Sequence, residues 1–451
     1  PGEVLEAVPG FITSQHSGEG KANQYYLRGF NLDHGSDFAT TLAGVPMNES
    51  SGAHAHGYSD VNLLIPELVS GVQYTKGPYF AEHGDFSAAG SANISYTNKL
   101  DHPVLSLSTG GFGWSRLFGA VSPEVAGGNM LFGLELSKND GPWELADDMR
   151  KVNTVLRYSQ GDARNGFSIT GMAYAARWNS TDQIPLRATK SGFISRYGNI
   201  DATDAGRTTR YSVAGDWLRS GTNQSTRITA YALRGGLNLF QNFTYFLADP
   251  VNGDQVEQEG RRWVTGAKAT HRRMGNWLGR HLESAVGVSV RNDAVGTVGL
   301  YATRGRQFLD AIRRDTVGQT TLGLFGQSEV EWSSVFRTTL GLRGDVYRYN
   351  VNALRPLNTG TGVTGLVSPK VTAVLGPWKA TELYLNYGHG YHSNDARAAT
   401  TVVDPISGEP VESANPLVPA RGGEFGLRSV AVSGLQTTMA LWYLAFDSEL
   451  I

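Results

Sequence analysis

The sequence predicts an all-β transmembrane fold, an antiparallel up-and-down β-barrel whose lumen is filled by a small N-terminal α+β domain. Three observations predict it. The chain has 56 glycines in 451 residues, above the usual share of roughly 7%, which favours many turns. Segments after residue 100 alternate apolar and polar side chains with a period of two. Short and long connections between those segments also alternate.

Bulk composition excludes several classes of protein. The formal net charge of −2 gives no field that would attract nucleic acid. The absence of cysteine excludes disulfides and thiolate metal sites. No run approaches the roughly 18 apolar residues that a spanning helix needs, but strands of a membrane barrel need only about 9–11 residues.

Residues 1–100 form a compact, irregular unit whose loops are rich in Gly, Ser, Asn and His. Its pattern indicates four short strands and two helices. The strands are expected at Tyr25–Arg28, Thr40–Leu42, Val69–Thr75 and Ala92–Thr97, and the helices near Val4–Val8 and Asp60–Leu64, the second ended by Pro66.

Residues 101–451 are regular. In one strand Leu322 and Leu324 lie on one face, and Glu329 and Glu331 lie on the other. Charged residues on the second face mean that this face is wet. A soluble β-sandwich shows the same alternation, so the loops must decide between the two folds.

Long loops recur after every second strand, which places all of them on one rim. Barrels of the bacterial outer membrane have this layout, with long external loops and aromatic girdles in contact with lipid. The expected long loops are Asp140–Asp148, Ser180–Gly206, Gln241–Glu259, Gly296–Gly318, Asn352–Val363 and Ser393–Arg421, and the expected girdle is Trp143, Trp178, Trp217, Trp263, Trp332, Tyr349 and Tyr391.

About 15 strands are expected between Val104 and Phe446. Bacterial single-chain barrels have an even number of strands, so we expect the complete barrel, of about 22 strands, to continue beyond Ile451. A lumen of that width needs a filling domain. The first residues, Pro1-Gly2-Glu3-Val4-Leu5, are typical of the interior of a domain. The chain is therefore expected to be cut at both ends.

Three short motifs follow one another in the first hundred residues: Arg28-Gly29-Phe30, Leu42-Ala43-Gly44-Val45-Pro46 and Tyr74-Thr75-Lys76-Gly77-Pro78. In this order they resemble the plug domain of TonB-dependent outer-membrane receptors, with Ala43 in place of the usual Asp. The positions that match the plug motifs are Arg28, Gly29, Phe30, Gly44, Pro46, Gly77, Pro78, Gly84 and Gly90.

The resemblance implies a plug domain over residues 1–100 and a receptor barrel over residues 101–451. It implies active import of a scarce ligand, driven by the TonB–ExbB–ExbD complex through a coupling segment that this sequence does not contain, and it implies a monomer. No catalytic fingerprint such as Gly-x-Ser-x-Gly or a P-loop occurs, so no enzyme and no intrinsic cofactor are expected.

The N-terminal unit also holds five of the ten histidines. His54 and His56 form the sharpest pair, because side chains at i and i+2 of an extended segment point the same way and could reach one metal ion. Neutral imidazole suits zinc and copper. The alternative is that these histidines only form hydrogen bonds, since two ligands do not complete a site. The candidate ligand contacts are His34, His54, His56, Tyr58 and His83, with His16 in the same group.

The expected cargo is a ferric siderophore, another metal chelate, or a zinc or copper ion favoured by the histidines. Cobalamin, haem and saccharides remain open. A passive porin or an adhesion barrel is the alternative class, and a metal-dependent hydrolase built on His54 and His56 with Asp33, Asp37 and Asp60 is a third.

Overall fold

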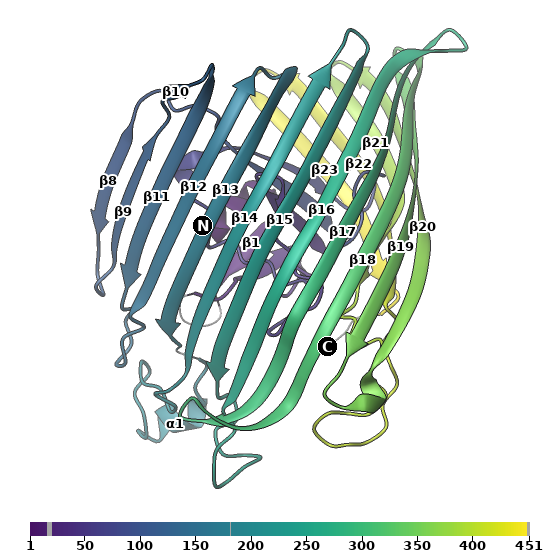
Figure 1. Ribbon diagram of the computed structural model, residues 1–451. Helices are drawn as coiled ribbons and strands as arrows, with labels where there is room; N and C mark the ends of the chain where they lie inside the picture. Colours follow the sequence, from purple (N-terminus) through teal and green to yellow (C-terminus); the bar gives the residue numbers. More distant parts are fainter. Residues whose placement is uncertain (16–19, 181, 449–451) are drawn as a thin grey trace.

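The computed structural model of the chain describes residues 1–15, 20–180 and 182–448. One antiparallel sheet of 16 strands dominates it and curves around the N-terminal residues (Figure 1). Fifteen of these strands follow one another in chain order from β8 to β23, and the short β10 pairs with β11 beside this path. The predicted antiparallel barrel sheet of about 15 strands is therefore confirmed.

The strands of this sheet are β8 (Val104–Thr109), β9 (Ser115–Val121), β10 (Glu124–Val125), β11 (Gly128–Asn139), β12 (Met149–Gly161), β13 (Asn165–Asn179), β14 (Ala205–Ser220), β15 (Gln224–Gln241), β16 (Val256–Trp277), β17 (Arg280–Arg304), β18 (Gln307–Ser333), β19 (Phe336–Asn352), β20 (Gly360–Trp378), β21 (Thr381–Ser393), β22 (Leu417–Val432) and β23 (Leu435–Phe446). Helices are few: the described part of the chain has α1 (Leu186–Lys190) and short 3-10 turns. None of the helices among the described residues is long and apolar enough to cross a membrane.

The two faces of the sheet differ as the period-two pattern predicts. On the outer face, Leu322 and Leu324 of β18 are 44% and 59% exposed. On the inner face, Gln319 and Asp345 are buried. Gln319 accepts a hydrogen bond at 2.7 Å from Ser50 of the N-terminal domain. The polar inner face is therefore the one that surrounds that domain.

The predicted aromatic girdle is wrong at three positions. Trp178 and Tyr391 are buried rather than exposed to lipid. Tyr349 also faces inward, since it pairs with the inner-face residue Gln319 and its ring lies 5.6 Å from that of the buried Tyr347. Trp178 lies on the inner face, where a side chain at Gly206 would collide with its ring. Trp217 and Trp263, by contrast, are exposed on the outer face. Aromatic residues near strand ends therefore occur on both faces of the sheet, and only the strand register shows which face each of them occupies.

The long connections lie at one end of the sheet, as predicted, with one exception. The expected loop Gly296–Gly318 is instead the outer half of a hairpin formed by β17 and β18. The pairing continues because a bulge between Val295 and Val298 absorbs the irregular, glycine-containing stretch. The connection itself is the pair Gly305-Arg306, both with positive φ, which is the backbone of a tight two-residue hairpin.

The N-terminal domain contains two small sheets. Strands β1, β2 and β3 form the first, and the second has the order β5-β4-β7-β6, in which β4 and β7 are parallel. Its elements are η1 (Gly2–Ala7), β1 (Phe11–Ser14), β2 (Gln24–Leu27), β3 (Phe30–Asn31), β4 (Phe38–Leu42), β5 (Val45–Pro46), η2 (Pro66–Leu68), β6 (Val69–Lys76) and β7 (Gly90–Tyr96).

The helix expected near Asp60–Leu64 is absent. The Asp60 carboxylate accepts a hydrogen bond from the Asn62 backbone at 2.8 Å, which favours a turn over a helix. Pro66 begins the 3-10 turn η2 instead of ending a helix, because proline suits the first turn of a helix. The helix expected at Val4–Val8 is the 3-10 turn η1.

The hydrophobic core joins the N-terminal domain to one part of the barrel wall. Leu5, Phe38 and Leu64 belong to the same buried cluster as Phe118 and Leu131 of β9 and β11. The barrel members of this cluster come from β9 to β16. The remaining wall meets the domain mainly through polar contacts, described below, and through a few apolar ones, such as Phe30 on Phe446 and Ala53 on the cluster around Val298.

The motif residues that resemble a plug lie at turns and close approaches. Arg28 and Gly29 both have positive φ and form the turn between β2 and β3. Gly44, also with positive φ, ends the turn between β4 and β5. A Cβ at Gly84 would lie 2.6 Å from the guanidinium of Arg343, so this glycine lets the barrel arginine approach. The other motif residues contact the barrel wall or lie at turns. The Phe30 ring packs on Phe446, and the carbonyls of Pro46 and Pro78 accept hydrogen bonds from Arg210 and Lys370 respectively. Gly77 and Gly90 have positive φ.

Arg28 also forms an ion pair with the barrel. Its Nη1 lies 2.6 Å from Glu424 Oε2, and both side chains are largely buried. Removing one partner of a buried pair leaves the other charge without compensation, so we expect Arg28→Ala to destabilise the docked domain by about 3 kcal/mol. The thermal unfolding midpoint of the purified protein measures this loss. The double variant Arg28→Met/Glu424→Leu should recover most of it, and an equal loss in both variants would contradict the account.

An acidic group in the loop between β13 and β14 gives the fold a pH dependence. Burial, together with Asp201 and Asp182, raises the pKa of Asp204 to about 8. The folded loop therefore holds a proton that the unfolded chain releases near pH 4. Stability is greatest below that pH and falls as the pH rises toward 8. We expect Asp204→Asn to slow proteolysis of this loop more at about pH 9 than at about pH 5. An equal effect at the two pH values would contradict the assignment.

Candidate functional site

The loop that follows β5 lies at the long-loop end of the barrel. Its histidine side chains reach Gln258 near the start of β16 and Ser393 at the end of β21, and its Gly52 carbonyl meets Arg397 in the loop after β21. All three barrel positions lie at the end of the sheet that carries the long connections. A ligand arriving through those loops therefore meets this part of the N-terminal domain first.

Asn48 fixes the start of this loop. Its buried side chain accepts a hydrogen bond from the Thr40 backbone at 2.8 Å and donates to the carbonyls of Gly35 and Phe38 at 2.8 and 2.9 Å. The loop closes at Gly57, which has a positive φ and whose Cβ would lie 2.5 Å from Ser36 Cα. Only glycine fits there without a backbone shift.

Three of the predicted ligand contacts come together as a ring cluster, His34, His54 and Tyr58. The His34 and His54 ring centroids are 5.1 Å apart, and each lies within 5.7 Å of the Tyr58 ring. His54 Nδ1 is 2.9 Å from Gln258 Oε1 of the barrel. His34 and Tyr58 are buried, and His54 is partly exposed. His54 is thus the member of the cluster that a ligand can reach.

His56 lies in a different environment from His54. Its ring packs 5.5 Å from the rings of Phe86 and His392, and its Nε2 hydrogen-bonds to the Ser393 carbonyl. The extended backbone expected at these residues is replaced by bends and turns. The period-two argument therefore does not apply, and the two imidazoles contact different partners.

Burial favours the neutral form of His34 and His56. It lowers the pKa of His34 despite the opposing effect of Asp33. It also lowers the pKa of His56, and His392 adds to that effect. Neutral imidazole can donate a hydrogen bond from one nitrogen and accept at the other. Both can therefore serve as hydrogen-bonding groups at physiological pH.

His83 lies apart from the ring cluster, beside Glu82 and Phe80. Burial lowers its pKa to about 4. His16 lies outside the described residues. Among the residues that the structure does describe, no group of three or more His, Asp or Glu side chains is arranged to hold a metal ion. Metal binding by His54 and His56 stays a prediction.

A polar seam joins the N-terminal domain to the barrel at residues 392–397. The Asp37 carboxylate lies 2.8 Å from His392 Nδ1. The Asp85 carboxylate accepts hydrogen bonds from the Ser393 backbone and hydroxyl at 2.7 and 2.5 Å. Arg397 donates to the Gly52 carbonyl at 2.7 Å. The sequence suggested Asp37 only as part of the alternative hydrolase site, and no motif singled out Asp85.

Asp395 holds Arg397 in place within this seam. The two side chains form an ion pair at 2.7 Å. Burial alone would raise the pKa of Asp395, but the guanidinium of Arg397 lowers it to about 2. The carboxylate therefore stays ionised, and the arginine stays aimed at the Gly52 carbonyl. This places a barrel loop directly against the loop that carries His54.

Two protein-family models match the chain. The model described as TonB-dependent Receptor Plug Domain matches residues 1–91, and the model described as TonB dependent receptor-like, beta-barrel matches residues 137–451. They confirm the resemblance drawn from the sequence motifs.

Solved structures share the fold at low sequence identity. The ferric citrate transporter FecA in its unliganded form has a TM-score of 0.78 at 14% identity, over 99% of this chain and 67% of its own. The copper transporter OprC has a TM-score of 0.72 at 15% identity, over 97% and 67%. The pyoverdine receptor FpvA of Pseudomonas aeruginosa PAO1, bound to pyoverdine, has a TM-score of 0.74 at 16% identity, over 98% and 66%.

Proposed function

Since the chain belongs to the TonB-dependent receptor family, whose members are transporters of the outer membrane, we propose that it imports a ferric siderophore or a related metal chelate. Ferric citrate and pyoverdine are the ligands named for two structural neighbours. The observation that carries the proposal is the ring cluster at the long-loop end. Its partly exposed member, His54, offers a chelate an imidazole ring, and the buried rings of His34 and Tyr58 pack behind it. Such a ring binds organic ligands through stacking and hydrogen bonds.

We further propose the division of labour between two domains. Residues 1–100 act as the plug, and residues 101–451 act as the barrel of a monomeric receptor. The plug meets part of the wall through apolar packing and the rest mainly through polar contacts such as the seam at 392–397. Polar contacts can be exchanged for water, so the plug can move when the TonB–ExbB–ExbD complex pulls on it.

A copper or zinc ion is the second candidate cargo. The copper transporter OprC is among the structural neighbours, and His34 and His54 lie with ring centroids 5.1 Å apart. Neutral imidazole suits both metals. A metal ion would need His54 to turn from Gln258 towards it, so this cargo requires a rearrangement that a chelate does not.

We expect His54→Ala to weaken chelate binding about tenfold, because truncating a central contact residue costs more than about 1 kcal/mol. Calorimetric titration of the complete receptor with ferric citrate and ferric pyoverdine measures the effect. Titration with Cu²⁺ and Zn²⁺ in parallel decides between chelate and ion. The exposed His102 provides a matched control variant, His102→Ala. Equal affinities of the wild type and His54→Ala for every probe would remove the ring cluster from the site.

A further inference from the structure

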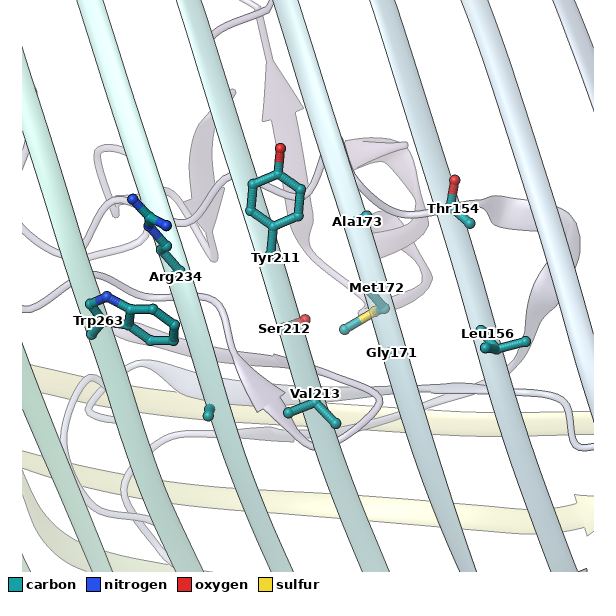
Figure 2. Close-up of a pocket in the computed structure, with 11 residues that line it drawn as sticks. Thr154, Leu156, Gly171, Met172, Ala173, Tyr211, Ser212, Val213, Arg234 and Trp263 are labelled. Atoms are coloured by element: carbon teal, nitrogen blue, oxygen red, sulfur yellow. The ribbon is translucent and has the colours of Figure 1, made fainter.

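Two adjoining grooves lie on the outer face of the barrel, away from the lumen. One has a volume of about 540 Å³ and the other about 940 Å³. They share Tyr211, Arg234 and Trp263, whose side chains come from three neighbouring strands, β14, β15 and β16 (Figure 2). The import pathway proposed above runs through the lumen and does not use them.

The smaller groove is apolar. Leu156 and Val213 form its sides, and Gly171 and Ala173 contribute little side-chain volume (Figure 2). Ala232, which also lines the groove, is equally small. A Cβ added at Gly171 would meet nothing closer than the Leu156 carbonyl at 3.9 Å. Small residues between larger ones thus leave a furrow in a wall that otherwise presents apolar side chains to lipid. Such a furrow fits an acyl chain.

The larger groove is cationic. Gly236 of β15 pairs with Thr209 of β14 on one side and with Arg261 of β16 on the other. Arg234 lies two residues along β15, on the same face. Arg207 lies two residues from Thr209 on β14. Three arginines therefore surround a position that has no side chain.

These arginines are only partly compensated. Within the described residues, the Arg207 side chain has no hydrogen-bond or ion-pair partner. Arg234 lies over the Trp263 ring, 5.8 Å from its centroid. Arg261 pairs with Glu259 at 2.6 Å but remains 70% exposed. Two carboxylates lie nearby, Glu259 and Glu257, the second of which accepts a hydrogen bond from Asn238, the strand partner of Arg207. Three positive charges with two carboxylates leave a net positive charge that favours an anion between the arginines.

The strand pattern places the cationic groove at the boundary of the apolar band. On the outer face of β17 the exposed residue Val290 is followed by Asn292 and then by Ala294, which lines the groove. This change occurs on the side of the long loops, because β17 runs from the short turn at Leu278-Gly279 towards Gly305. The apolar groove lies deeper in the membrane than the cationic one. Its residues Val213 and Ala232 pair with each other, and Ala232 lies two residues closer than Arg234 to the short-turn end, where β15 begins.

We propose that the joined grooves bind a phosphate-bearing lipid of the outer leaflet. Its acyl chain lies in the apolar groove, and its phosphate lies between Arg207, Arg234 and Arg261. Guanidinium groups bind phosphate through two parallel charge-assisted hydrogen bonds. Tyr211 and Trp263 lie where the two halves meet, as amphipathic rings do at a membrane interface. Because the apolar groove continues into the cationic groove, together they fit an amphipathic anion better than a free phosphate ion.

The test is native mass spectrometry of the complete, delipidated receptor titrated with lipid A. Each basic residue near a membrane surface strengthens the binding of an anionic lipid about fivefold, so the triple variant Arg207→Gln/Arg234→Gln/Arg261→Gln should bind about a hundredfold more weakly. A matched control removes three exposed arginines at the short-turn end, Arg219→Gln/Arg273→Gln/Arg280→Gln, and should bind as the wild type does. A second variant, Gly171→Leu, fills the apolar groove without changing charge and should also weaken binding.

Dephosphorylated lipid A and inorganic phosphate distinguish the source of the anion. We expect the wild type to bind the dephosphorylated lipid about as weakly as the triple variant binds lipid A, and inorganic phosphate not to displace lipid A. Equal loss in the triple variant and in its control would overturn the proposal, as would displacement by inorganic phosphate. Unchanged binding in Gly171→Leu would overturn the acyl-chain assignment. Heat-modifiable mobility in gels confirms that each variant is a folded barrel.

Discussion

A disulfide formed by Ala53→Cys and Gly260→Cys is expected to abolish transport while leaving ligand binding in place. A Cβ built at Gly260 of β16 lies 3.4 Å from the Ala53 Cβ in the plug loop, near the usual range of about 3.5–4.5 Å for a disulfide. The 451 residues of the chain contain no cysteine that could compete for either thiol. If import requires the plug to move, a covalent tether to the barrel wall stops it.

Uptake of radiolabelled ferric chelate by cells that express the complete receptor measures this effect. The oxidised double variant should show no uptake, and addition of a reductant should restore it. Each single-cysteine variant should transport as the wild type does under both conditions. Undiminished uptake by a fully oxidised double variant would show that the tethered loop stays still during transport.

Removal of residues 1–100 from the complete receptor is expected to convert it into a passive pore. The plug packs on Phe118, Leu131 and other residues of the inner wall, and it hydrogen-bonds to the opposite wall at Gln319 and Ser393. With it gone, the polar inner face of a wide barrel would be open to water.

Swelling of liposomes in small sugars measures this permeability. Liposomes with the truncated receptor should swell rapidly, and those with the intact receptor should not. Rapid swelling with the intact receptor would favour the passive porin that the sequence left open. Gel mobility before and after heating shows whether the truncated barrel is folded.

The sequence predicted the barrel because its signal is local. Alternation along β18 and β19 identifies the lipid face at Leu322 and Leu324 without any knowledge of partners. The positions of most long loops follow from the same alternation. The plug motifs added the identity of the N-terminal domain, because Arg28-Gly29 and Gly44 stand at turns that need positive φ.

The errors arose where tertiary contacts decide. Glycines between Gly296 and Gly318 indicated a loop, but a bulge carries the pairing through them. Trp178 resembled a girdle residue until register placed it on the inner face. The sequence pattern had suggested a helix near Asp60–Leu64, but the Asp60 carboxylate accepts a hydrogen bond from the Asn62 backbone and stabilises a turn instead.

The candidate site was predicted only in part. Proximity in sequence grouped the histidines, and the structure brings His34, His54 and Tyr58 together. The partners of this region, Gln258 and Ser393, are 204 and 337 positions from the histidines they contact. No local pattern can reveal such contacts, and so the separation of His56 from His54 could not be foreseen.

Energised uptake tests the central claim, plug-gated import of a metal chelate, most directly. Cells that rely on this receptor are supplied with ⁵⁵Fe-labelled ferric citrate and ferric pyoverdine, with and without functional TonB and with and without a protonophore. The account predicts saturable accumulation of a chelate that ceases when TonB is absent or the proton gradient is collapsed, while surface binding persists. Accumulation that continues without TonB and without the gradient would contradict it.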